Sequence, residues 1–475
     1  MRSVTGLSFT LGALGLVLAS ALPAVTSSAH AGGFTTTRFG GEGGHAATSD
    51  VSAIFYNPAG VSYGKGLRIY AEGLFVYRTV DYNRDPGAVD AATTTGSTPA
   101  DGLAANSGKA TLANGVISPF FGVTYSPIKN LGVGVSLTVP FGGQASWDKQ
   151  DADSNPNYPG SVDSSARWAS IEGAQRALYY SLAVGWHTDD RKFAVGASVS
   201  LIQSEINLVR ARNLDNTDHL VNDDGTIKEG RALLDVKSTD VGAAIGVMYQ
   251  PTPCSRIGVS YHSQPGFGEQ TLEGTLTTRL GTGAPGSIPI EVKQSLPDAI
   301  RVGGEWRAFE KAALHFAFDY QRWSLFKAQC IVNPSSPDGA CDTNDDGQLL
   351  DPANSAVNAN LVRNWKDTFG LRVGGSYYPS ENLEINAGLL YDSNAVPDNT
   401  LDPALIDMDK LIPQLGVKYT AGKVLISATL GDVIYFSRTT APRTAAPAGK
   451  NRSPDMAGDY KQSVAYVLFG VGANL

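Results

Sequence analysis

The chain has 475 residues, a formal net charge of -8, 53 glycines and only 17% charged residues. The acidic balance argues against nucleic acid as a partner, because phosphate backbones attract basic surfaces. Soluble domains carry about 25% charged residues, so this composition favours a membrane protein, and one large barrel accommodates the length better than two or three ordinary domains.

Residues 1–31 have the features of an export signal. Arg2 supplies the positive start, an apolar run extends from Leu7 to Ala24, and the small-residue pattern AHA at 29–31 marks a cleavage site. A membrane anchor is the alternative, but the run is shorter than the roughly 20 residues that a spanning helix needs. The mature chain is therefore predicted to begin at Gly32.

A glycine-rich segment follows, and residues 32–65 are predicted to form a hatch, a short plug that a larger body encloses. Its candidate gate and ligand residues are Gly32, Gly33, Phe34, Ile54, Phe55, Tyr56, Asn57, Pro58 and Ala59. An Asn-Pro step moves the residue before proline out of the helical region and fixes the turn that follows. So short a segment can bury its apolar residues only against something larger.

From residue 66 onward the recurring signal is strict alternation. Apolar residues alternate with small or polar ones in 131–139, 178–186, 193–201, 241–249 and 314–320. Strands with one apolar face and one small or polar face are typical of a barrel with lipid outside and a polar or filled lumen. Such a barrel crosses a membrane without any long apolar run, because closure pairs every backbone group.

Six segments share a small residue followed three places later by an aromatic one. They are GVTY at 122–125, AVGW at 183–186, GVMY at 246–249, GGEW at 303–306, GGSY at 374–377 and GVKY at 416–419. The spacing places the two residues on opposite faces, and the aromatic ones are predicted to face outward as a belt at one membrane interface.

A short turn follows each of these aromatic residues, and long loops alternate with the short turns. This pattern predicts an all-β fold, a transmembrane antiparallel β-barrel of about fourteen strands over residues 66–475, with both termini in the periplasm. A soluble sandwich of two sheets is the alternative, but it does not need this alternation of turn lengths.

The segment SAIFYNPAG at 52–60 resembles the start of the mature proteins in the long-chain fatty acid and aromatic hydrocarbon transporter family of bacterial outer membranes (FadL/TodX-like, OMPP1). Segments 135–148, 296–307 and 391–419 resemble later blocks of that family. In the family an N-terminal hatch sits inside the barrel, and its Asn-Pro-Ala signature maps onto Asn57, Pro58 and Ala59.

The resemblance implies passive uptake of hydrophobic compounds, long-chain fatty acids first and aromatic hydrocarbons second. The implied route is capture by external loops, transfer to a pocket touching Phe34 and Ile54 to Tyr56, rearrangement of the hatch and release through the wall. The implied setting is a multi-pass monomer in the bacterial outer membrane, with membrane lipid, lipopolysaccharide and the barrel-assembly machinery as partners.

Strand breakers indicate where such a wall could open. Pro119, the segment 264–268 and Pro297 interrupt otherwise regular strands, and each removes a ladder bond or favours a bulge. A bend without an opening is the alternative at each position.

Three basic residues, Arg301, Arg372 and Lys418, face the lumen by the parity of their strands. They either pair with the hatch, for example with Glu42 or Asp50, or one of them binds a fatty acid carboxylate. Arginine offers a planar, two-pronged match to that group.

Ser62 lies in GVSYG, which matches the nucleophile elbow of esterases. An elbow needs a strand before it and a helix after it, whereas here a proline turn precedes and a strand is predicted to follow. The six histidines show neither metal-ligand nor triad spacing. We therefore predict no enzyme. The rival functions are a general diffusion porin, an adhesin or structural barrel, and an outer-membrane lipid hydrolase using Ser62.

One predicted external loop carries two further signals. Asp342, Asn344 and Asp346 place oxygen atoms at every second residue before a glycine, as in the first half of a calcium loop, although a solvated acidic loop is the alternative. No other cofactor is predicted. Three cysteines in an exported chain fit one disulfide and one thiol, and Cys330 is paired with Cys341 because they flank this loop.

Overall fold

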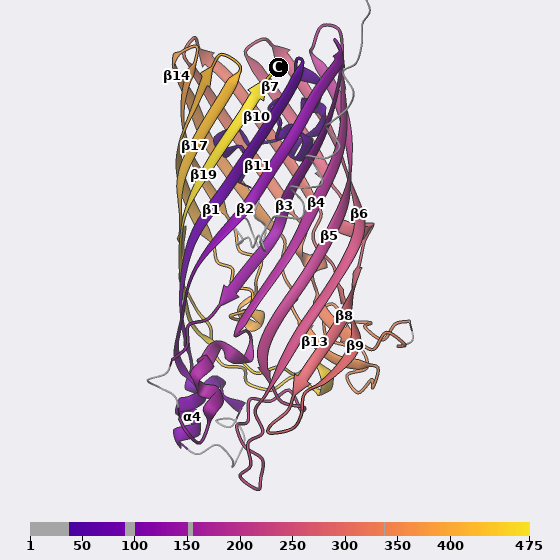
Figure 1. Ribbon diagram of the computed structural model, residues 1–475, viewed down its shortest axis with the longest axis vertical. Coiled ribbons are helices and arrows are strands. Elements are labelled where there is room, and N and C mark those ends of the chain that lie inside the picture. Colours follow the sequence, from indigo (N-terminus) through magenta and orange to yellow (C-terminus); the bar gives the residue numbers. More distant parts are fainter. Residues whose placement is uncertain (1–37, 91–99, 151–154, 337) are drawn as a thin grey trace, which may run out of the picture.

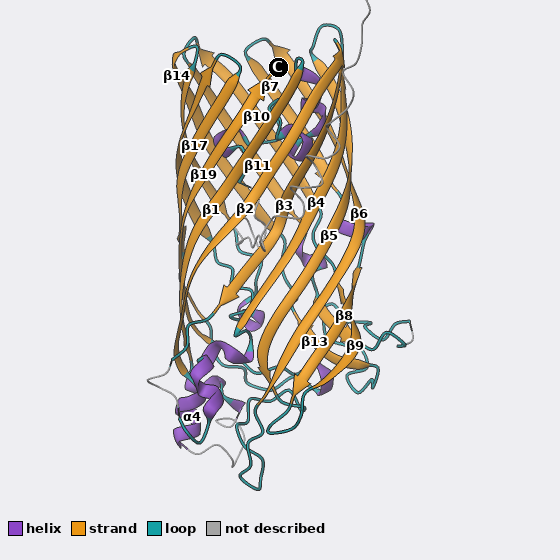
Figure 2. Ribbon diagram, in the orientation of Figure 1, coloured by secondary structure: helices purple, strands orange, loops and turns teal. Residues whose placement is uncertain are grey.

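The computed structural model describes residues 38–90, 100–150, 155–336 and 338–475. The predicted export signal and the candidate residues Gly32, Gly33 and Phe34 lie outside the described residues. The described part forms a tall cylinder of strands with a small helical group inside one end and long loops at the other (Figure 1, Figure 2).

The wall strands follow one another in chain order. The strand segments are β1 (Leu67–Arg84), β2 (Gly108–Ile128), β3 (Leu131–Ser146), β4 (Glu172–His187), β5 (Phe193–Arg212), β6 (Gly230–Thr252), β7 (Ser255–His262), β8 (Gln270–Arg279), β9 (Gly286–Gln294), β10 (Ala299–Phe309), β11 (Ala312–Gln321), β12 (Ala328–Val332), β13 (Val357–Val362), β14 (Thr368–Ser380), β15 (Leu383–Asp392), β16 (Lys410–Ala421), β17 (Val424–Tyr435), β18 (Arg438–Thr439) and β19 (Gly458–Asn474).

Helical segments are short and lie in the hatch and in the loops. They are η1 (Gly41–Gly43), α2 (Ala53–Tyr56), η2 (Pro58–Tyr63), η3 (Pro86–Ala88), α4 (Ala100–Asn106), η5 (Pro159–Asp163), η6 (Ser165–Trp168), η7 (Pro265–Phe267), η8 (Trp323–Leu325), η9 (Asp398–Thr400) and η10 (Gly449–Asn451). Within the described ranges no helix is long and apolar enough to cross a membrane.

The sheet closes on itself. Nineteen segments make fourteen wall strands, because four wall strands are each interrupted into two segments and the short β18 continues β17. The first strand, β1, pairs antiparallel with β2 on one side and with β19 on the other. Closure gives each wall strand a partner on both sides over at least part of its length. The predicted fold, an antiparallel barrel of about fourteen strands, is confirmed.

The predicted aromatic residues all face outward near the short turns. Their side chains are between 45% and 56% exposed, and they are Tyr125, Trp186, Tyr249, Trp306, Tyr377 and Tyr419. Beyond them the outer surface is apolar along each strand, with Leu182, Val247 and Leu371 as examples. Such rings next to an apolar band form the aromatic girdle of a barrel surrounded by lipid.

Each predicted strand breaker lies at an interruption of the wall. β2 pairs with β1 along its length but with β3 only from Phe120 onward, directly after Pro119. Segment 264–268 separates β7 from β8, and Pro297 lies between β9 and β10. Proline cannot donate to a ladder, so the breaks follow directly from these residues.

The long-loop end is held together by buried ion pairs. Arg84 contacts Asp218 at 2.6 Å, and Arg167 contacts Glu229 at 2.9 Å. Burial alone would raise the pKa of Glu229, but the guanidinium groups of Arg167 and Arg231 outweigh it and hold this pKa below its usual range. The stabilisation from Glu229 is therefore present at neutral pH and is lost only as the pH falls through that lowered pKa.

Candidate functional site

The described part of the hatch, residues 38–65, lies inside the barrel near its short turns (Figure 1, indigo). Its contacts reach different sides of the wall. They join Gly40 N to Glu72 Oε1 on β1 (2.8 Å), Asn57 Nδ2 to Val247 O on β6 (3.0 Å), Arg372 Nη1 on β14 to Gly44 O (2.8 Å) and Arg38 Nη2 to Asp392 Oδ2 on β15 (3.1 Å). Strands on several sides therefore hold this segment across the lumen.

The Asn-Pro-Ala signature ends one helical turn and starts the next. Asn57 has extended backbone angles, φ -163° and ψ 104°, as expected for a residue before proline. Pro58 occupies the first turn of η2, where its missing N–H costs nothing, and Ala59 N donates to Asn57 Oδ1 at 3.1 Å. The amide of Asn57 also donates to Ala46 O at 2.7 Å. Asn57 thus caps a helical turn and ties two parts of the hatch together.

The apolar residues of the hatch are buried. Ile54, Phe55 and Tyr56 are 0%, 5% and 3% exposed, and the ring of Phe39 stacks on Phe120 of β2 at 4.5 Å between centroids. Burying each large side chain contributes roughly 1.5–3 kcal/mol. The wall is therefore the larger body against which this short segment buries its apolar side chains.

Small wall residues let the hatch backbone approach closely. A Cβ at Gly196 would lie 2.3 Å from Ala59 N, and one at Gly246 would lie 2.0 Å from Asn57 Oδ1. Gly246 is the small residue of the GVMY segment, and Gly303 of GGEW meets Ala46 N in the same way at 2.8 Å. Sequence reasoning recognised these segments by their aromatic residue and missed what the glycine does.

A small cavity lies against the hatch, and we call it the hatch cavity. Ile54 and Phe55 form its hatch side, whereas Tyr56 instead donates its hydroxyl to Phe39 O at 2.9 Å. The wall side includes Phe141, Tyr179, His262, Ala299 and Arg301. Of these wall residues, sequence reasoning singled out only Arg301, because the set meets only through the register of distant strands.

The three lumen cations differ in what they contact. Arg372 donates to hatch carbonyl oxygens, as described above, and Lys418 Nζ lies 3.5 Å from Asp50 Oδ2, one of the two partners considered for it. The other, Glu42, accepts a hydrogen bond from Gln414 at 2.6 Å. Arg301 lies in the hatch cavity, so two of the three cations fasten the hatch and the third borders the empty space.

Ser62 is part of the hatch packing. It is 1% exposed, and its hydroxyl donates to Ala59 O at 2.8 Å. Two glycines of the wall, Gly132 and Gly185, lie next to its backbone. A nucleophile elbow presents its serine at an open turn between a strand and a helix. Here β1 follows a buried helical turn, so this serine has a role in shaping the hatch.

A second cavity lies in the long-loop half of the lumen, and we call it the outer cavity. Its apolar lining includes Leu208, Leu234, Val292 and Ile331. Arg363 borders it and pairs with Asp402 at 2.6 Å, and Arg210 lies within electrostatic range of Arg212, Asp402 and Arg363. In the described part of the chain, Arg210 has neither an ion-pair nor a hydrogen-bond partner.

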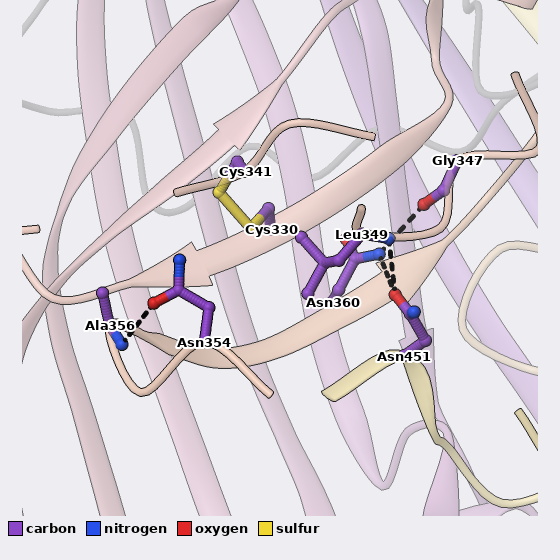
Figure 3. The surroundings of a disulfide bond; sticks show 8 residues. All are labelled: Cys330, Cys341, Gly347, Leu349, Asn354, Ala356, Asn360 and Asn451. Carbon is purple, nitrogen blue, oxygen red and sulfur yellow. Dashed lines mark hydrogen bonds between the residues drawn. A yellow bond between two sulfur atoms is a disulfide. The ribbon is translucent and has the colours of Figure 1, made fainter. Parts of the chain in front are cut away.

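The loop between β12 and β13 is stapled by a disulfide between Cys330 and Cys341 (Figure 3). Asn360 Nδ2 donates to Gly347 O at 2.9 Å and to Asn451 Oδ1 at 2.8 Å. The same Asn451 oxygen accepts from Leu349 N at 2.9 Å. Cys254, in the turn between β6 and β7, is an exposed free thiol.

Breaking this staple is expected to open the loop. In Cys330→Ser/Cys341→Ser the lost constraint is worth about 2–4 kcal/mol for a short closed loop, so limited proteolysis should cleave residues 333–356 at least tenfold faster. Cys254→Ser is the matched control and should cleave like the wild type. Equal cleavage of all three proteins would show that the hydrogen bonds of Asn360 and Asn451 suffice.

The calcium hypothesis stays a prediction. Asn344 Oδ1 accepts from the backbone N–H groups of Asp346 and Gln348, at 3.0 and 2.9 Å, so one candidate ligand oxygen already serves a turn. Among the described side chains of His, Cys, Asp and Glu, no three are placed to hold a metal ion. If Asp342, Asn344 and Asp346 bind calcium, a chelator will accelerate cleavage of the same loop.

Comparison with known proteins agrees with this architecture. A family model described as outer membrane protein transport protein (OMPP1/FadL/TodX) matches residues 17–428. Outer membrane protein P1 of Haemophilus influenzae is 26% identical over 426 residues, which cover 85% of this chain and 86% of that protein.

Two solved structures share the fold. A Pseudomonas aeruginosa FadL homologue has a TM-score of 0.72 at 16% identity, covering 93% of this chain and 99% of that one. The Ralstonia pickettii toluene transporter TbuX has a TM-score of 0.61 at 15% identity, covering 93% and 98%.

Proposed function

The chain belongs to the outer membrane protein transport family (OMPP1/FadL/TodX), and on that premise we propose that it takes up long-chain fatty acids by passive diffusion. Its family makes it an outer-membrane β-barrel for hydrophobic compounds. The proposal adds the ligand class, a rearrangement of the hatch during passage and lateral release into the membrane.

The observation that carries the proposal is an apolar cavity closed by the hatch. The hatch cavity and the outer cavity lie along one lumen, and a buried aromatic cluster containing Phe141, Trp323 and Trp365 lies in the long-loop half. An apolar solute gains by leaving water for such surfaces. A general diffusion porin instead needs an open, water-filled lumen, and a lumen crossed by the hatch does not provide one.

Basic side chains beside both cavities favour an acid over a neutral hydrocarbon. Arg301 borders the hatch cavity, and Arg363 borders the outer cavity, where it also pairs with Asp402 at 2.6 Å. Guanidinium groups bind carboxylates through paired hydrogen bonds, whereas toluene offers them only a ring face. Aromatic hydrocarbons remain the second candidate ligand, because a toluene transporter shares this fold.

Lateral release is supported by the wall between β2 and β3. The ladder between these strands ends at the pair Phe120 and Thr138, so the part of β2 before Phe120 does not pair with β3. β3 itself continues along β4 as far as the pair Ser146 and Glu172. Pro119 and Pro140 lie on the two sides of this unpaired stretch. Unpaired strands part without breaking ladder hydrogen bonds, so this stretch is the proposed exit.

Uptake by whole cells tests the function. We expect cells lacking the gene to lose most labelled oleate uptake at low concentration, to keep most toluene uptake, and to recover oleate uptake on complementation. Loss of toluene uptake alone would make aromatic hydrocarbons the ligand.

Three other results would favour the rival functions. Unchanged uptake of both compounds would favour an adhesin or structural barrel. A large steady conductance in planar bilayers would favour a general diffusion porin, and esterase activity that Ser62→Ala removes would favour a lipid hydrolase.

A further inference from the structure

Two wall glycines make room for one acidic side chain of the hatch, that of Glu42. Gly374 of β14 pairs with His315 of β11 on one side and with Gly388 of β15 on the other. A Cβ at Gly374 would lie 2.1 Å from Glu42 Oε1, and one at Gly388 would lie 2.0 Å from Glu42 Oε2. The carboxylate of Glu42 therefore occupies the space of two missing side chains, beside His315.

Glu42 and His315 each keep a buried atom without a hydrogen bond. Their side chains are 0% and 6% exposed, and Glu42 Oε1 lies 3.8 Å from His315 Nδ1. Among the described residues neither of these two atoms has a hydrogen-bond partner. A separation of 3.8 Å is too long for a hydrogen bond, and burying polar atoms without partners is unfavourable. A small shift of either side chain would let the two atoms pair.

A second histidine lies nearby but is less suited to bind a proton. The ring of His45, in the hatch, lies 5.4 Å from that of His315, centroid to centroid. His45 Nδ1 accepts a hydrogen bond from Ala47 N at 3.2 Å. A proton on this nitrogen would remove that bond, because a protonated imidazole has no acceptor. Proton binding beside Glu42 is therefore favoured at His315.

Charged groups of the hatch and of five wall strands surround His315. Lys418 lies 3.5 Å from Asp50, and Arg256 lies 2.6 Å from Glu305, so these four charges are paired. The acidic groups outnumber the basic ones by one, and a positive charge on His315 balances the set. The members are Glu42 and Asp50 of the hatch, Arg256 of β7, Glu305 of β10, Arg372 of β14, Glu384 of β15 and Lys418 of β16.

We propose that Glu42 and His315 form a proton-dependent latch of the hatch. When His315 is protonated, its Nδ1–H donates to Glu42 Oε1 and holds the hatch in place; when His315 is neutral, the hatch moves more readily. Charge-assisted hydrogen bonds are roughly twice as strong as neutral ones. The latch rests on the hatch movement in the proposed function and adds its regulation by pH.

The direction of the effect follows from where the proton binds. A displaced hatch withdraws Glu42 from His315, so the protein binds this proton more tightly with the hatch in place. Acid pH therefore favours the hatch in place, and this preference is lost as the pH rises and His315 becomes neutral. One linked proton changes the ratio of the two hatch positions by at most about tenfold per pH unit.

Planar-bilayer recordings of the purified full-length protein at pH 5 and pH 8 test the latch, since a displaced hatch lets ions pass and no ligand is needed. We expect wild-type openings to be at least about fivefold more frequent at pH 8 than at pH 5. His315→Gln takes up no proton, so its openings should be frequent at both pH values. His315→Lys stays charged, so its openings should be rare at both.

Glu42→Gln removes the charge that pairs with His315 and should also lose the pH response, which decides the matter even if His315→Lys does not fold. The control is His219→Gln in the loop between β5 and β6, at the end of the barrel away from the hatch, and it should respond like the wild type. Wild-type openings of equal frequency at both pH values would overturn the latch. A response that persists in both His315→Gln and Glu42→Gln would do the same, whereas oleate uptake decides the proposed function separately.

Discussion

Asn57→Ala is expected to reduce uptake at low ligand concentration at least tenfold while the barrel still folds. The Asn57 amide donates to Ala46 O, Val247 O and Val259 O at 2.7, 3.0 and 3.4 Å, and its own oxygen caps Ala59 N. Losing these four buried bonds costs about 2–6 kcal/mol at roughly 0.5–1.5 kcal/mol each. Because Phe55 lies on the same segment, a loosened hatch no longer forms its side of the hatch cavity.

Labelled oleate uptake checks this result, with heat-modified electrophoretic mobility as the measure of barrel folding. Asn222→Ala is the matched control, since Asn222 is exposed in a loop and donates to Thr226 Oγ1 at 3.0 Å. It should transport like the wild type. Normal uptake by a folded Asn57→Ala protein would show that the signature is not needed to position the hatch.

Gly196→Val is expected to displace the hatch and raise ion conductance. A Cβ at this position would lie 2.3 Å from Ala59 N and 2.4 Å from the carbonyl carbon of Pro58, so backbone has to move. Overpacking of this kind typically costs about 1–3 kcal/mol. This cost changes the ratio of molecules with the hatch in place to molecules with the hatch displaced by about 5- to 150-fold. Planar-bilayer recordings should show openings that are rare in the wild type.

The control for this prediction places the same side chain on an unobstructed part of the wall. In Gly115→Val the nearest atom to the new Cβ is Val76 O at 3.9 Å, an ordinary contact. This variant should conduct like the wild type, so added β-branching on a strand does not explain an effect at Gly196. Equal conductance of the two variants would mean that the hatch moves without opening a path.

In the proposed passage, hatch movement and lateral release are separate steps. The hatch cavity is lined by Phe55 on one side and by wall residues of β7 and β10 on the other, so a ligand there would touch both the hatch and the wall. The unpaired stretch between β2 and β3 starts beside Phe120, which stacks on the hatch residue Phe39. A shift of the hatch would therefore change the packing at the proposed exit directly.

Local sequence patterns sufficed to predict the barrel. Strand alternation has a period of two, so the sequence of each segment predicts which side chains face outward. Tyr125, Trp186 and Tyr249 do face outward as predicted. The Asn-Pro step is equally local, and Asn57 adopts the extended backbone that proline requires of its predecessor. Parity likewise assigned Arg301, Arg372 and Lys418 to the lumen without any knowledge of their partners.

Only the tertiary structure decided which lumen residues meet one another. Arg301, His262 and Phe55 come from three distant parts of the chain and share a cavity because closure and register bring β7 and β10 against the hatch. Alternation shows which face of a strand a side chain lies on, but not how far along the barrel axis it lies relative to other strands. Only the structure therefore shows that Lys418 lies next to Asp50. The use of Gly196 and Gly246 is likewise visible only where hatch and wall backbones touch.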